Sequence, residues 1–217
     1  MFKLIQNFII DLLFPICCLG CQQENKTKEY LCEKCFKKLV FCKRSYHFQL
    51  DFLDNIAIAG DYEDKILNQL ITTLKFNAIK PIGNILAKFL CLFWQGRAIL
   101  YPQKFIVIPI PLSETRERYR GFNQAEVIAL YFANYFQYEL NLQLKKIKNT
   151  KAQAELSEEK RLNNVKGIFQ WKGENLSGKS IIIIDDVITT GSTINEAAKT
   201  LKLAGAKSII ALAIAKG

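Results

Sequence analysis

Hydrophobic positions along the chain recur with two different periods. Short apolar runs, which suit strands covered on both faces, occur at 56–59, 105–108, 181–184 and 208–214, with a further probable strand over 142–147. Stretches with helical spacing fill the intervals at 63–76, 81–94 and 122–138, and another helix is expected after the loop that follows residue 184. This alternation predicts an α/β domain built on a mostly parallel sheet.

The first part of the chain follows a different pattern. Residues 14–44 are rich in cysteine and lysine and hold no long apolar run, so we expect a small N-terminal unit over 1–50 and a larger domain over 51–217. An amphipathic helix is predicted ahead of the cysteine-rich segment, because apolar residues recur there at helical spacing: Ile5, Phe8, Ile9 and Leu12.

Export and membrane insertion are not expected. The N-terminal apolar stretch is interrupted by Asp11 and Pro15, has only Lys3 as a basic start, and lacks a small-residue cleavage site. The sequence contains no run of about 18 apolar residues, the length that a membrane-spanning helix needs. The sequence therefore predicts a cytoplasmic protein.

The chain is basic, with 30 Lys and Arg against 20 Asp and Glu and a formal net charge of +10 among 217 residues. Such a charge attracts phosphates, either in a small ligand or in a nucleic acid, although biased composition alone can produce part of it. One polar stretch, 148–164, has few apolar residues and predicts either a functional lid or a linker.

Four cysteines form two close pairs with the spacing of a metal site. Cys18 and Cys21 are separated by two residues, as are Cys32 and Cys35, and the two pairs can offer four thiolates to a structural zinc ion. Redox chemistry or unrelated buried cysteines are the competing interpretation, and Cys17 is an alternative to Cys18 as ligand. Cys42 and Cys91 are expected to be ordinary buried residues.

The segment 173–180 matches the G-x4-G-K-[ST] phosphate-loop pattern letter for letter. A nucleotide-binding loop of this kind follows a strand and opens a helix, so that backbone N–H groups converge on the phosphates. Here the pattern runs directly into the apolar run 181–184. We therefore interpret it as a turn before a strand.

A second polar loop stands in the correct order, after that strand. Asp185 and Asp186 are expected at the carboxyl edge of the sheet, where their carboxylates can accept hydrogen bonds from sugar hydroxyls. Residues 189–193 supply short hydroxyls and a glycine for an anion-binding loop. Thr193 and Glu196 have the spacing of a capping box, which predicts that the helix N-terminus faces a bound phosphate.

Four aliphatic residues, Asp-Asp, two residues and Thr-Thr-Gly-x-Thr make up the motif of type I phosphoribosyltransferases that bind phosphoribosyl pyrophosphate (PRPP), and 181–193 resembles it throughout. The segments 108–112, 116–124, 161–165 and 167–169, with the four cysteines, resemble the ComF (ComFC) competence-protein branch of that superfamily. This resemblance implies a type I phosphoribosyltransferase fold with a small N-terminal zinc-binding module.

The resemblance also implies a site. PRPP binding falls on Asp185, Asp186, Val187, Ile188, Thr189, Thr190, Gly191, Ser192 and Thr193. Pyrophosphate binding falls on Pro109, Ile110, Pro111, Leu112, Ser113, Arg116 and Arg118, and the lid and substrate loop on Arg120, Asn123, Gln124, Gln153 and Arg161. Mg²⁺ is expected to accompany PRPP, between pyrophosphate and ribose oxygens rather than in a protein cage.

Two functions follow from the resemblance. One is a PRPP-binding protein of natural transformation that handles incoming single-stranded DNA, with a competence helicase or recombination mediator as a possible partner. The other is an active phosphoribosyltransferase with an unknown nitrogen acceptor; no catalytic residue is assigned, and a surface role is expected for His47.

Basic and aromatic residues interleave beside the cysteine pairs. They either contact DNA phosphates and bases or pack the module on the main domain. The basic residues are Lys34, Lys37, Lys38, Lys43 and Arg44, and the aromatic ones are Phe36, Phe41, Tyr46 and Phe48.

Overall fold

A computed structural model describes residues 15–25, 27, 29–44, 46, 48, 50–101, 103–148 and 166–217. The helices are α2 (Glu33–Phe36), α3 (Lys65–Phe76), α4 (Pro81–Ala98), α5 (Glu114–Arg120), α6 (Gln124–Phe136) and α8 (Ser192–Leu203). The strands are β1 (Asn55–Asp61), β2 (Phe105–Pro109), β3 (Glu139–Leu140), β4 (Leu144–Lys146), β5 (Phe169–Trp171), β6 (Ser180–Ile188) and β7 (Ser208–Lys216).

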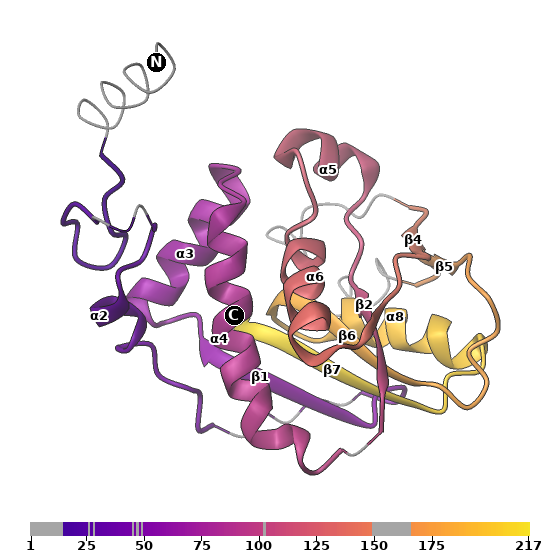
Figure 1. Cartoon of the computed structure of the whole chain (residues 1–217). Helices are drawn as coiled ribbons and strands as arrows, with labels where there is room; N and C mark the ends of the chain where they lie inside the picture. Colours follow the sequence, from indigo (N-terminus) through magenta and orange to yellow (C-terminus); the bar gives the residue numbers. More distant parts are fainter. Residues whose placement is uncertain are drawn as a thin grey trace, which may run out of the picture.

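The main sheet has five strands in the order β1-β7-β6-β2-β3, and all its neighbouring pairs are parallel. Helices α3, α4 and α6 cover one face and α8 lies on the other (Figure 1). The isoleucines of β6 explain this arrangement, because their side chains alternate between the faces. Ile182 and Ile184 join the core under α3, α4 and α6, whereas Ile181 and Ile183 join the core under α8. The predicted α/β fold is confirmed.

Local sequence signals set several helix ends. The Asp64 carboxylate accepts hydrogen bonds from the N–H groups of Ile66 and Leu67 and so caps α3. Pro81 begins α4, where its missing N–H costs nothing. Gly121 ends α5 in the left-handed conformation (φ 78°), and its N–H donates to the Glu117 carbonyl at 2.7 Å.

Two segments differ from the sequence predictions. The strand expected over 142–147 is only Leu144–Lys146, and it pairs antiparallel with β5 in a separate two-stranded sheet. The interval between the apolar run 105–108 and the helix predicted from residue 122, where no element was predicted, contains a helix, α5, because its charged residues favour helix and none of the helix has to be buried. Strands β3 and β5, two and three residues long, gave no readable period.

The phosphate-loop lookalike is a turn, as predicted. Residues 173–179 connect β5 to β6, and Ser180 already belongs to the strand. The pattern thus opens no helix, and its N–H groups are not gathered at a helix N-terminus.

The N-terminal module packs on the main domain. Buried Cys18, Leu31 and Cys35 belong to the same hydrophobic cluster as α3, α4 and α6. The segment that connects the module to β1 crosses to the other face, where the N–H of Phe52 donates to the Asn195 side chain of α8 at 3.2 Å. The division at residue 50 stays a prediction.

The amphipathic helix predicted over residues 5–12 and His47 lie outside the described residues. Within the described part of the chain, no helix combines the length and apolarity needed to cross a membrane.

Candidate functional site

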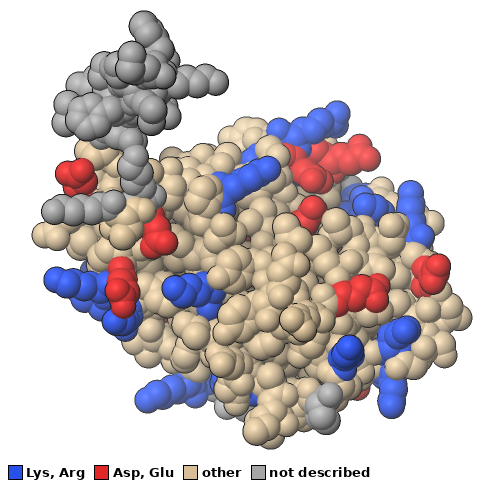
Figure 2. All heavy atoms as spheres, in the orientation of Figure 1, with Lys and Arg blue, Asp and Glu red and all other residues tan. Residues whose placement is uncertain are grey.

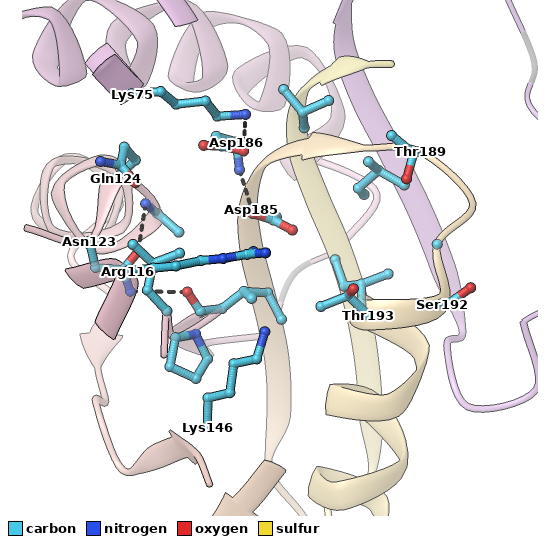
Figure 3. A pocket seen from close by; sticks show the side chains of 18 of the residues that line it. Lys75, Arg116, Asn123, Gln124, Lys146, Asp185, Asp186, Thr189, Ser192 and Thr193 are labelled. Atoms are coloured by element: carbon cyan, nitrogen blue, oxygen red, sulfur yellow. Dashed lines mark hydrogen bonds and ion pairs between the residues drawn. The ribbon is translucent and has the colours of Figure 1, made fainter. Parts of the chain in front are cut away.

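A polar cavity of about 230 Å³ opens at the carboxyl ends of β6 and β2 (Figure 3). The loop after β6 forms one wall, and side chains from α3, α5, α6 and β4 form the others. Its lining comprises Lys75, Ile110, Pro111, Leu112, Arg116, Arg120, Asn123, Gln124, Ala125, Lys146 and every residue from Asp185 to Ile194. The structure thus brings together the two segments that the sequence singled out, 110–112 and 185–193.

The adjacent acids Asp185 and Asp186 point to opposite faces of the sheet, because side chains alternate along a strand. Asp186 continues the face of Ile184 and meets α3, where Lys75 Nζ lies 3.0 Å from its carboxylate. The two side chains keep only 17% and 11% of their surface exposed. This ion pair fixes the base of the cavity from a helix in which the sequence indicated no site residue.

Asp185 lies on the other face and carries a perturbed carboxyl group. Burial is the largest cause, and the neighbouring Asp186 charge adds to it, so the pKa of Asp185 is raised to about 7. The charges of Lys75 and Lys146 and the N–H of Asp186, which donates to Asp185 Oδ1 at 2.8 Å, oppose that rise. Asp185 is therefore poised between its neutral and charged forms near neutral pH.

Two cations, Lys146 of β4 and Arg116 of α5, line the cavity opposite that acid (Figure 3). Burial and, second, the nearby Arg116 charge lower the pKa of Lys146 to about 8, against the opposing effect of the Asp185 charge. Two like charges placed together in a partly buried site repel each other, and an anion bound between them would offset that repulsion.

The loop after β6 is shaped to receive an anion. Gly191 has φ 79° and precedes α8 with no side-chain cap, which leaves the first-turn N–H groups directed toward the cavity end of the helix. Hydroxyl groups of Thr190 and Ser192 lie 2.8 Å apart beside it.

The predicted capping box at the start of α8 is wrong. Gly191 rather than Thr193 is the N-cap residue, and the helix begins at Ser192. Glu196 Oε1 accepts a hydrogen bond from the Gly167 N–H at 2.6 Å. Glu196 therefore anchors the segment before β5 instead of closing the helix end, and it leaves that end open to a ligand.

The start of α6 holds the loop after β2 in place. Asn123 is buried, its Oδ1 accepts from the Ala125 N–H at 3.1 Å, and its Nδ2 donates to the Ile110 carbonyl at 3.0 Å. Arg120 Nη1 donates to Gln124 Oε1 at 2.9 Å. Asn123 thus fixes the loop, while Arg120 and Gln124 present polar groups to the cavity.

Some residues expected at the site lie elsewhere. Pro109, Ser113 and Arg118 line a neighbouring open cavity of about 900 Å³ between α5 and the small sheet, and their pyrophosphate role stays a prediction. Gln153 and Arg161, expected in the lid, lie outside the described residues. Conversely, Lys75 and Lys146 were missed, because a single lysine at the end of a helix or short strand belongs to no motif.

The paired cysteines converge as predicted. The Sγ atoms of Cys18, Cys21, Cys32 and Cys35 all lie within 4.8 Å of one another. Those of Cys21 and Cys32 are 4.0 Å apart, close to the sulfur separation of about 3.8 Å that tetrahedral zinc geometry requires. Cys17 lies apart, with its thiol directed to the Pro15 carbonyl at 3.7 Å, so Cys18 is the fourth member of the cluster.

The donor chemistry of this cluster fits a metal ion. Burial raises the pKa of the Cys18 thiol, but the backbone N–H groups of Cys32, Cys21 and Gly20 outweigh it, and the pKa falls to about 6. The Cys32 N–H lies 3.3 Å from Cys18 Sγ. Backbone N–H groups therefore favour a thiolate at Cys18, the form that binds a metal such as zinc, whereas burial and the neighbouring thiols raise the pKa of Cys35 to about 12.

The aromatic residues beside the module mostly pack inward. The Phe41 ring lies 5.0 Å from that of Phe89 and 5.7 Å from that of Phe93, both on α4. Phe36 packs against the core with Lys88 over its ring. For Phe36 and Phe41, the structure favours packing on the main domain over a role as stacking faces. On the face in Figure 2, basic and acidic residues are scattered and form no continuous basic patch.

Comparisons with known proteins agree with this architecture. Residues 126–217 match the family model of the phosphoribosyl transferase domain. The chain is 31% identical over 201 residues to "Competence protein F" of Haemophilus influenzae, covering 88% of this chain and 86% of that one. It is 35% identical over 141 residues to "Competence protein ComFC" of Bacillus subtilis (64% and 55%) and 27% identical over 201 residues to "DNA utilization protein YhgH" of Shigella flexneri (88% and 86%).

Proposed function

Because the chain belongs to the competence protein F (ComF/ComFC) family and carries its phosphoribosyltransferase domain, we propose that the cavity at the end of β6 binds PRPP. One observation carries the proposal. A single cavity combines an anion-binding loop at a helix N-terminus, a carboxylate for sugar hydroxyls, and cations on the opposite wall. PRPP offers a phosphate, a ribose and a pyrophosphate to these three parts.

Each part has a role in this proposal. The N–H groups and hydroxyls of 189–193 bind the 5-phosphate. Asp185 accepts hydrogen bonds from ribose hydroxyls, and Asp186, held by Lys75, positions it. Arg116 and Lys146 bind the pyrophosphate, with the backbone of 110–112 nearby.

Ligand binding would favour the charged forms of Lys146 and Asp185. Pyrophosphate oxygens between Arg116 and Lys146 favour the protonated lysine, and two hydroxyl donors favour the Asp185 carboxylate. Carboxylate and hydroxyl oxygens are also suitable ligands for Mg²⁺, which usually keeps several waters and is otherwise bound by substrate oxygens and one or two carboxylates. Bound Mg²⁺ would neutralise pyrophosphate charge.

In the cell, we infer a role in handling incoming single-stranded DNA during natural transformation, in the cytoplasm and together with a helicase or recombination mediator. The names of the relatives, which refer to competence and DNA utilization, support this inference. The net charge of +10 is of the sign that DNA attracts.

A second candidate is catalysis: transfer of phosphoribose from PRPP to a nitrogen nucleophile with release of pyrophosphate. The observation in its favour is that Asp185 and Lys146, with pKa values of about 7 and about 8, line the same cavity. Groups that titrate near neutral pH are typical of proton transfer at active sites.

Calorimetry with PRPP and Mg²⁺ tests the binding proposal. We expect one PRPP per chain, and a loss of affinity of about tenfold or more in Arg116→Gln, since a charge-assisted hydrogen bond is removed. Arg118→Gln is the matched comparison on the same helix, and its loss should be smaller because Arg118 lines the other cavity. No PRPP binding by the wild-type chain would refute the proposal; equal losses in the two variants would refute the assignment of the arginines.

Pyrophosphate release separates the two candidates. The wild-type chain is incubated with PRPP, Mg²⁺ and either nucleobases, ammonia or single-stranded DNA. Release with any acceptor, lost in Lys146→Met, establishes turnover. PRPP binding without release across the panel favours the binding role.

A further inference from the structure

A second cavity, here called the β1 cavity, lies beside the edge strand β1 and measures about 390 Å³. The segment after the cysteine module, the first half of β1 and the end of α4 form its walls. Among the described residues, none that lines it also lines the proposed PRPP cavity. Its volume lies in the range of about 300–1,000 Å³ that is usual for small-ligand sites.

The β1 cavity is lined by aromatic rings. Tyr46, Phe48, Phe93, Trp94 and Tyr101 all contribute to its walls. Trp94 and Tyr101 are stacked, with ring centroids 5.3 Å apart and an angle of 17° between the planes. Such walls suit a flat, unsaturated ligand.

Two arginines give the β1 cavity a preference for anions. The Arg97 guanidinium lies 3.7 Å from the centre of the Phe93 ring, and its Nη1 donates to the Phe93 carbonyl at 3.0 Å. Arg44 Nη1 lies 2.9 Å from the Asp61 carboxylate and 3.8 Å from that of Glu63, two acids outside the lining that hold the side chain and offset part of its charge. Both side chains are positioned while using few of their five N–H donors, and no described lining residue is acidic.

From these observations we propose that the β1 cavity binds one nucleotide unit, with its base among the rings and its phosphate at Arg97 and Arg44. The inference rests on the nucleic-acid part of the proposed function and not on PRPP binding. The unit is either part of a DNA strand or a free nucleotide, since both present the same chemistry.

The β1 cavity also adjoins the phosphate loop. Phe48 lines it, and a Cβ atom placed on Gly191 would lie 3.3 Å from the Phe48 ring. Phe48 thus lies between the two sites. PRPP is therefore expected to shift nucleotide affinity without abolishing it, and a nucleotide must shift PRPP affinity by the same factor.

Tryptophan fluorescence provides the test, because the chain has only two tryptophans. In full-length Trp171→Phe, Trp94 is the sole reporter. Thymidine monophosphate and a short oligothymidylate are titrated in turn, with PRPP and Mg²⁺ present in excess to occupy the phosphate loop. We expect the Trp94 emission to change saturably: with the oligothymidylate alone if a strand is the ligand, and with both probes if a free nucleotide suffices.

Variants then locate the site by fluorescence anisotropy of a labelled probe. Arg97→Gln should weaken binding about tenfold, through loss of a charge-assisted hydrogen bond. Lys172→Gln, which removes an exposed cation just after β5, is the control for general charge. PRPP affinity, measured on the same variants, should be unchanged and confirms that they are folded.

Three results would overturn the inference. They are unchanged Trp94 emission while the probe binds, a loss in Arg97→Gln no larger than in Lys172→Gln, and complete displacement of the nucleotide by PRPP. None of them bears on whether PRPP binds. Failure of PRPP binding in the wild-type chain would instead refute the proposed function and leave this site open to the same measurement without PRPP.

Discussion

Substitution of Lys75 by methionine tests the ion pair at the base of the proposed PRPP cavity. At 3.0 Å and an effective dielectric constant of about 20, the gross attraction between Lys75 and Asp186 is roughly 5 kcal/mol. Desolvation of the two mostly buried groups offsets much of it. We expect a net loss of about 2 kcal/mol, since Lys75→Met leaves two adjacent carboxylates without this cation. For a chain of this length the melting temperature should fall by roughly 4–8 °C.

The assay is urea and thermal unfolding of the full chain, and two comparisons make it specific. Lys65→Met removes an exposed lysine from the first turn of the same helix and should change stability by less than about 0.5 kcal/mol. In the double variant Lys75→Met with Asp186→Asn, part of the loss should be recovered, because the uncompensated charge is gone. Equal effects at positions 65 and 75, or strict additivity in the double variant, would refute the reasoning.

Three further predictions concern single positions. The pKa of Asp185 is raised from 3.8 to about 7, so between about pH 4 and pH 7 the folded chain holds a proton that the unfolded chain has lost, and stability falls as the pH rises through this window. Asp185→Asn should remove this fall when stability is measured by urea unfolding at several pH values. An unchanged pH profile in the variant would contradict the assignment. Gly191→Ala should destabilise the chain by about 1–2 kcal/mol because of its φ of 79°, whereas Gly96→Ala, in open space on α4, should be neutral or stabilising; similar melting shifts would count against this. Elemental analysis should find one zinc per chain in Cys17→Ser and none in Cys35→Ser, and zinc retained by the latter would dismiss the ligand set.

The parts of the fold that sequence predicted were those with a strong local signal. The isoleucine run of β6 predicts a strand that is covered on both faces, and the loop that follows it lies at the edge of the sheet, as expected. The four cysteines likewise converge, as their paired spacing predicted. The local sequence pattern was sufficient to predict a segment's structure where that pattern is compatible with only one structural environment.

The remaining features depend on tertiary structure. Lys75 and Lys146 reach the cavity only because α3 and β4 happen to end beside β6, which no short motif encodes. The capping-box pattern at Thr193 was overridden when Glu196 found the Gly167 N–H, a partner 29 residues away. Opposed directions of Asp185 and Asp186 follow from strand alternation, but the strand had first to be known to continue through them.

A crystal structure of the chain with PRPP and Mg²⁺ tests the central claim most directly. The account predicts the 5-phosphate at the N–H groups of 189–193, ribose hydroxyls at Asp185, and pyrophosphate between Arg116 and Lys146. PRPP bound outside this cavity, or a phosphate loop that stays closed and empty while the ligand occupies another site, would contradict it.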